Sequence, residues 1–89
     1  MKSRALPQFW ELYQRLPKRV RRRAGKAYRL WQRDPDMPSL HFKRVGTTRP
    51  VYSVRIGDEY RALGLLQDDT VTWFWIGRHD EYERMLKHR

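Results

Sequence analysis

The sequence has no cysteine and no long apolar segment, and each absence excludes a class of protein. Without cysteine, neither a disulfide framework nor a thiolate metal site can support the fold. No run approaches the roughly 20 apolar residues that a membrane-spanning helix needs. Residues 1–4 are not followed by the apolar core of a secretory signal. We therefore expect a cytoplasmic protein without a membrane partner.

Acidic residues are also scarce. The sequence has ten acidic residues and 20 lysines and arginines, so its 89 residues carry a net charge of +10. Fifteen of the 20 basic residues are arginines, whose planar guanidinium suits phosphate groups and base edges. This balance favours a nucleic-acid partner. A solvated basic surface, an acidic protein partner or an anionic membrane would also fit the charge taken alone.

The signatures of several common enzyme classes are missing. The sequence has no glycine-rich phosphate-binding loop, no cluster of metal-ligating side chains and no serine-nucleophile motif. His41 stands alone in its segment, and we assign it no role. We therefore expect neither a metal ion nor a cofactor.

The first third of the chain has the spacing of two helices. Apolar side chains recur at helical intervals over 6–16 and again over 17–33. The pair Leu16-Pro17 separates these segments, and Asp34-Pro35 ends the second one because a residue before proline avoids helical backbone angles. A connection this short predicts a helical hairpin.

The remaining residues have the period of strands. Segments 39–45, 51–56, 60–66 and 71–76 read as strands, and 79–87 reads as a short helix or turn. The run 71–76 is apolar on both faces, so we expect it to be central. The order predicts one α+β domain over residues 1–89. In it, an N-terminal helical hairpin packs on a mainly antiparallel sheet of about four strands, followed by a short C-terminal helix.

Turn lengths predict how these strands face one another. A three-residue turn at 57–59 places Arg55 opposite Arg61, whereas a two-residue turn would put them on opposite faces. A four-residue connection at 67–70 places Trp73 opposite Gly64 and Trp75 opposite Ala62, so that large side chains face small ones. We expect the core face to carry Tyr52, Val54, Ile56, Trp73 and Trp75.

This register places two arginines side by side on the face away from the core. Like charges directly opposite each other are destabilising unless something offsets them. A bound phosphate, held bidentately by Arg55 and Arg61, is one offset. The alternative is that both side chains reach into water or pair with Asp58 and Glu59 in the turn.

His79 and Tyr82 form a second group. They are three residues apart, so a short helix places them on one face, close to Arg61 at the end of the preceding strand. A histidine can exchange a proton near pH 7, and together with a tyrosine and two arginines it could cleave RNA. The ribose 2′-hydroxyl would attack, and the arginines would stabilise the negative charge. Alternatively, His79 caps the helix and Tyr82 packs against Trp75.

The third group is the basic segment 15–29. Its lysines and arginines surround the apolar stripe of the predicted second helix. This arrangement predicts a surface that contacts a phosphate backbone through Lys18, Arg19, Arg22, Arg23 and Lys26. The alternative is a solvated face, since long basic side chains often only cover a surface.

Taken together, the chain resembles the RelE/ParE superfamily of bacterial toxin–antitoxin toxins. The resemblance rests on three segments: LPKRVRRRAGKAYRLWQRDPDMPSLHFKRV (16–45), YSVRIGDEYRALGLL (52–66) and WFWIGRHDEY (73–82). It implies a RelE-like, metal-independent endoribonuclease that cleaves mRNA on the ribosome and inhibits translation. The implied catalytic residues are Arg55, Arg61, His79 and Tyr82. The implied partners are mRNA, the ribosome and a cognate antitoxin, with which the chain would form a hetero-oligomer.

The sequence departs from this family in two places. Ser53 stands where RelE has a lysine, so we expect Lys43 and Arg44 to supply charge from the neighbouring strand. The usual first strand is not apparent, so we expect a sheet with one strand fewer. The ParE branch instead inhibits DNA gyrase, and a toxin fold without activity could simply bind RNA or protein.

The same face carries an apolar patch made of Leu63, Leu65, Phe74 and Ile76. Exposed together, these side chains would form a sizeable hydrophobic surface. In this family an antitoxin segment wraps such surfaces, and an amphipathic helix would suit the patch. The alternative is that the C-terminal helix covers it.

Overall fold

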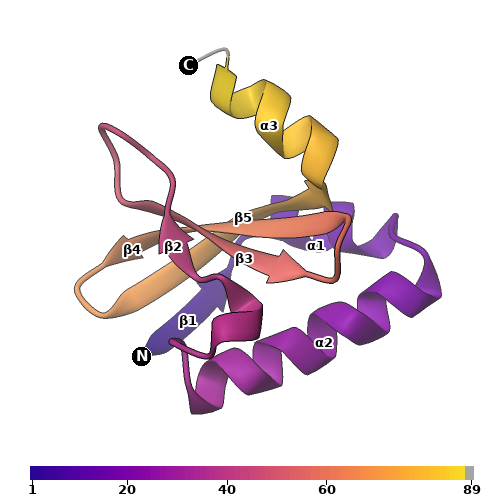
Figure 1. Cartoon of the computed structure of the whole chain (residues 1–89), viewed down its shortest axis with the longest axis horizontal. Coiled ribbons are helices and arrows are strands. Elements are labelled where there is room, and N and C mark those ends of the chain that lie inside the picture. The colour runs from indigo at the N-terminus through magenta and orange to yellow at the C-terminus, as the bar shows by residue number, and fades with distance from the viewer. Residues whose placement is uncertain (88–89) are drawn as a thin grey trace.

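Residues 1–87, which the computed structural model describes, form a five-stranded sheet with two helices on one face and one on the other (Figure 1). The strands lie in the order β1-β5-β4-β3-β2. Their bounds are β1 Lys2–Ala5, β2 Lys43–Arg44, β3 Val51–Ile56, β4 Tyr60–Gln67 and β5 Thr70–Arg78. The helices are α1 Pro7–Gln14, α2 Lys18–Arg33 and α3 His79–Lys87, and η1 Pro38–Leu40 is a 3₁₀ turn. The α+β class and the layering agree with the prediction.

Strand β1 is a feature that the sequence analysis missed. It pairs in parallel with β5, with Ser3 opposite Val71 and Ala5 opposite Trp73, whereas the other pairs are antiparallel. The expectation of a shorter sheet was therefore wrong. The strand is short and polar and lies at the edge, so it is held by pairing with β5 instead of by an apolar pattern of its own.

The two N-terminal helices form where the proline positions predict them. Pro7 lies in the first turn of α1, and Pro17 is the residue before α2. Helix α1 packs on β5 and α2 packs on β3. No helix within residues 1–87 is long and apolar enough to cross a membrane.

Segment 39–45 is only partly a strand. Pro38 starts a 3₁₀ turn, and His41 ends it in the left-handed conformation with φ of 46°. Leu40 is buried in the main core, and the strand is limited to Lys43–Arg44. The predicted strand over 39–45 was therefore wrong for its first residues, because a proline and a left-handed residue interrupt the extended backbone.

The predicted register is right in one hairpin and half right in the next. Arg55 lies opposite Arg61, and Gly64 lies opposite Trp73. A β-bulge then shifts the register, so Ala62 faces Ile76 and Trp75 faces Leu63. The two-residue turn at Asp68 and Asp69 has positive φ at both positions, as a tight hairpin requires.

The bulge corrects two assignments. Trp75, expected in the main core, lies on the α3 side, whereas Ile76, expected in the exposed patch, is 2% exposed in the main core. The main core lies between the sheet and helices α1 and α2. A second, smaller core lies under α3 and consists of Val51, Leu63 and Tyr82, with Val45, Leu65, Phe74, Trp75, Met85 and Leu86 against them. Helix α3 therefore packs against the patch that the sequence predicts.

Candidate functional site

The site begins with the arginine pair at the end of the β3–β4 hairpin. Arg55 and Arg61 are directly opposite, on the face that carries α3. Arg55 Nε donates a hydrogen bond to the Gly57 carbonyl oxygen at 3.2 Å, and Arg61 Nη1 lies 3.4 Å from the same oxygen. Arg61 Nη1 also donates to the Tyr60 carbonyl at 2.8 Å. Both guanidinium groups are therefore fixed against one turn.

The electrostatics of Arg61 reflect this crowding. Burial, followed by the positive charge of Arg55, lowers the pKa of Arg61 below its ordinary value, while Tyr82, Asp58 and Glu83 act in the opposite direction. An arginine remains charged at neutral pH despite such a shift. The pair is thus a partly dehydrated concentration of positive charge, which an anion would stabilise.

His79 lies at the start of α3, immediately after β5 ends. Its backbone N–H donates to the Glu59 carbonyl at 2.6 Å, and its Nε2 lies 3.2 Å from Glu83 Oε1. The imidazole is 34% exposed, so solvent and a ligand can reach it. Its ring centroid lies 5.5 Å from that of Tyr82. The strand end therefore fixes the histidine in position.

Tyr82 is more buried than a freely accessible acid or base. Its side chain is 7% exposed and belongs to the small core under α3, together with Leu63 and Trp75. It nevertheless acts on the charge of Arg61 and contacts the ring of His79. Tyr82 thus links the two groups, and the structure brings all four predicted catalytic residues to one end of the sheet.

The two residues predicted on the neighbouring strand separate. Lys43 lies opposite Ser53, and residues opposite each other in an antiparallel pair share a face, so Lys43 is on the arginine face. Arg44 lies opposite Tyr52, on the other face, and its Nε donates to the Gly46 carbonyl at 3.0 Å. Only Lys43 can therefore add charge beside Ser53.

The predicted RNA-binding residues of α2 lie on the far side of the sheet and are exposed: Lys18, Arg19, Arg22, Arg23 and Lys26. One of them reaches the site. Arg23 Nη1 would lie 3.3 Å from a Cβ placed on Gly57, the residue whose carbonyl both site arginines contact. Helix α2 has no acidic residue in its first turn and no side-chain cap. Through Arg23, the basic surface of α2 therefore reaches the β3–β4 turn that fixes the arginine pair, and Figure 1 shows the start of α2 on the same side of the molecule as this turn.

The sequence analysis missed Glu83 as part of the site. Its spacing from His79, four residues along a helix, is the signal that could have indicated it. It also missed the pair of Arg78 and Glu59, whose Nη1 and Oε2 lie 3.6 Å apart. Within residues 1–87, no group of three histidine, cysteine or acidic residues is placed to hold a metal ion.

A groove of about 370 Å³ lies between α1, α2 and the sheet, and we call it the aromatic groove. Its aromatic lining consists of Phe9, Trp10, Tyr13, Tyr28, Trp31 and Trp73. Trp10 and Tyr28 are 50% and 40% exposed. Sequence reasoning did not find it, because the space depends on how α1 and α2 pack on the sheet. The small residues Ala24, Gly25 and Ala27 of the helical stripe also line it.

Comparisons with known proteins agree with this fold. The profile of the ParE-like toxin domain family matches residues 18–84. A chain of the RelB–RelE antitoxin–toxin complex from Methanococcus jannaschii superposes with a TM-score of 0.72 at 16% identity, covering 91% of this chain and 95% of that chain. No curated protein sequence matches the chain.

Two further structures are similar. A chain of the toxin–antitoxin complex RelBE2 from Mycobacterium tuberculosis has a TM-score of 0.69 at 20% identity, covering 88% of this chain and 96% of that one. The isolated RelE toxin from E. coli has a TM-score of 0.66 at 16% identity, covering 98% and 96%. At these identities the superpositions show the shared fold, and the profile match covers most of the chain. The protein therefore belongs to the ParE-like toxin family.

Proposed function

We propose that the protein is the toxin of a toxin–antitoxin pair and acts as a RelE-like endoribonuclease on ribosome-bound mRNA. The observation that carries the proposal is the arginine pair, fixed on one turn, with an accessible histidine at the adjacent strand end. Such a group needs no metal ion to bind a phosphodiester and to move a proton. The basic surface of α2 supplies affinity for the RNA backbone.

In the proposed reaction, the ribose 2′-oxygen attacks the adjacent phosphorus. His79 accepts the proton of the 2′-hydroxyl, and Arg55 and Arg61 bind the phosphate oxygens, whose negative charge grows in the transition state. The bond from phosphorus to the 5′-oxygen breaks, and that oxygen takes a proton from solvent. The products are a 2′,3′-cyclic phosphate and a 5′-hydroxyl end. Tyr82 supports the ring of His79.

The test is controlled expression in bacteria with growth and primer extension on an abundant mRNA followed together. We expect growth arrest and new 5′ ends with the wild-type chain. The variant His79→Asn should lose both, while His41→Asn, a matched change at an exposed histidine in a left-handed turn, should keep both. Arrest without new ends, together with trapped gyrase–DNA complexes, would contradict the nuclease and favour a ParE-like gyrase inhibitor.

We also propose that the partner is an antitoxin that places an acidic, amphipathic helix in the aromatic groove. The lining is mainly apolar and includes Arg4 but no acidic side chain, and Arg29 lies beside Gly25. An apolar stripe flanked by carboxylates would match both features. Two of the similar structures are complexes of a toxin with its antitoxin.

A change at Gly25 tests this placement. The antitoxin is first selected from a genomic library by its ability to restore growth. The variant Gly25→Leu fills the groove and should arrest growth like the wild type, but the selected antitoxin should no longer restore it. Gly25→Ala, whose added carbon meets only Arg29 Nη1 at 3.6 Å, should still be neutralised. Equal rescue of the leucine variant would exclude the groove as the docking place.

A further inference from the structure

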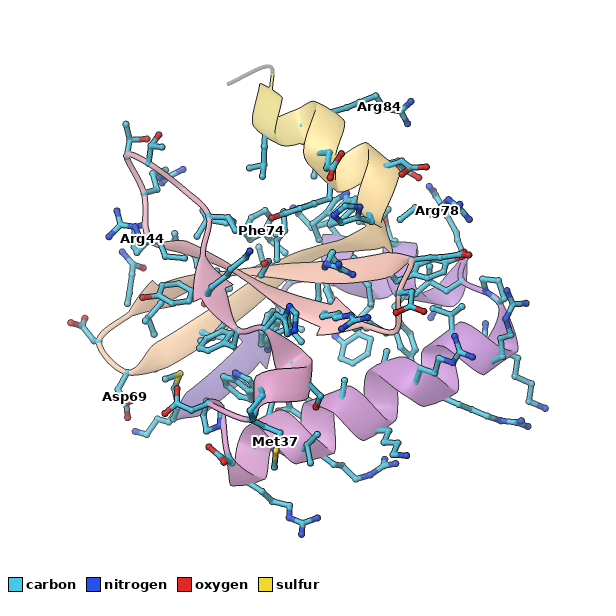
Figure 2. All side chains as sticks on the ribbon, viewed as in Figure 1. Met37, Arg44, Asp69, Phe74, Arg78 and Arg84 are labelled. Atoms are coloured by element: carbon cyan, nitrogen blue, oxygen red, sulfur yellow. The ribbon has the colours of Figure 1, made fainter. Side chains whose placement is uncertain are left out.

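All three ion pairs found within residues 1–87 lie at the candidate site. Each joins a basic group at this end of the sheet to a nearby acidic side chain: Arg55 to Asp58, Arg78 to Glu59, and His79 to Glu83. Figure 2 shows Arg78 at this end and Asp69 at the opposite end of the sheet. The chain has only ten acidic residues, so three ion pairs at one site distinguish that site from the rest of the surface.

Helix α2 has the opposite character. Its residues, 18–33, include eight lysines and arginines and no acidic residue. None of the ion pairs found within residues 1–87 involves this helix. The protein therefore has two basic zones. The side chains of α2 take part in none of these ion pairs, whereas Arg55, Arg78 and His79 at the site are already paired with the protein's own carboxylates.

We infer that Asp58 is an internal competitor for phosphate that determines which RNA the site accepts, an inference that rests on the proposed function. Its carboxylate pairs with the Arg55 guanidinium, the group that would bind a phosphate oxygen. Asp58 is 88% exposed in the turn, so it can leave without disturbing the core. A phosphate that binds Arg55 must displace the Asp58 carboxylate. The Glu83 carboxylate pairs with His79 in a similar way.

Such competition makes occupancy of the site depend on a second contact. A single phosphate or a short RNA gains little binding free energy at the site, because its contact with Arg55 replaces an existing ion pair. An RNA already bound along α2 presents its next phosphates to the site at high effective concentration, and so displaces Asp58. The site thus discriminates in favour of a large, multivalent RNA such as that of a ribosome.

The experiment compares Asp58→Asn with Asp69→Asn, which changes the charge equally in the turn at the far end of the sheet. The probes are inorganic phosphate and a four-nucleotide RNA, and binding is measured from the NMR signals of the arginine Nε–H groups. We expect Asp58→Asn to bind both probes about threefold more tightly than the wild type, since an exposed ion pair has a modest effect. Asp69→Asn should remain close to the wild type, and Asp58→Glu, which keeps the carboxylate, should bind weakly.

Equal tightening by the two asparagine variants would overturn the inference, because net charge alone would then explain it. An unchanged affinity in Asp58→Asn would do so as well. Melting temperatures of both variants verify the fold. The binding measurement needs no cleavage, so it decides the role of Asp58 even if the nuclease proposal fails. If the nuclease proposal holds, Asp58→Asn should also raise the cleavage of free RNA more than that of ribosome-bound mRNA.

Discussion

Arg61→Gln should reduce the cleavage of ribosome-bound mRNA by at least about 100-fold, the loss typical when a preorganised donor to a developing negative charge is removed. The guanidinium is partly buried and fixed by the Tyr60 and Gly57 carbonyls, so in the proposed reaction it would bind the phosphate without reorganising. Glutamine keeps much of the side-chain length but carries no charge. The measurement is the single-turnover rate by primer extension, with the growth of expressing cells as a second readout.

The stability of this variant should not fall, so a loss of cleavage can be assigned to the reaction and not to unfolding. Burial and Arg55 both lower the pKa of Arg61, so its charge is unfavourable in the folded protein. The control is Arg49→Gln, the same change at an exposed loop residue between β2 and β3, which should cleave like the wild type. Cleavage by Arg61→Gln within about threefold of the wild type, far below the loss of about 100-fold expected for such a donor, would show that the phosphate does not bind at the arginine pair.

Gly64→Ala should destabilise the protein by about 2–3 kcal/mol, the upper range for overpacking a core. A Cβ at residue 64 would lie 2.8 Å from Trp73 Cε3 and would collide with Val71 Cγ1. Trp73 and Val71 are 6% and 0% exposed, so neither can move aside. A loss of this size is a large part of the total stability of a small domain.

Gly25→Ala is the matched opposite. The added carbon makes only an ordinary contact, with Arg29 Nη1 at 3.6 Å, and alanine favours the helix over glycine by about 1 kcal/mol, so this variant should become more stable. Urea denaturation measures both changes in the free energy of unfolding, through a shift of the midpoint urea concentration while the dependence on urea concentration stays the same. A wild-type midpoint for Gly64→Ala would mean that β4 and β5 adjust more freely than their close approach indicates.

The site was predictable as far as strand pairing determines it. Once the 57–59 turn has three residues, Arg55 and Arg61 must be neighbours, and the end of β5 must bring His79 beside them. The register that puts Lys43 and not Arg44 beside Ser53 was not predicted, because the loop between β2 and β3 leaves it open. The ion pair of Glu83 was also within reach, because Glu83 follows His79 by four residues in the helix predicted over 79–87, but the sequence analysis did not use that spacing.

Other features could not be read because they arise from long-range contacts. Strand β1 has no apolar period, and its backbone becomes a strand only against β5. The bulge beside Phe74 left no trace in a run that is apolar on both faces, so Trp75 was assigned to the wrong side. The aromatic groove depends on how far apart two helices settle on the sheet, which spacing within each helix cannot determine.

The position of β5 in the chain also affects when the protein can act. This strand bonds to β1 on one side and β4 on the other, yet it follows both of them in sequence. While the protein is being synthesised, β1 therefore has no partner until residues 70–73 have emerged. Of the four candidate catalytic residues, His79 is the third to be synthesised, after Arg55 and Arg61. A nascent chain that stops before β5 has neither a closed sheet nor a histidine near its arginines. The proposed cleavage therefore cannot begin until β5 and the start of α3 have been synthesised.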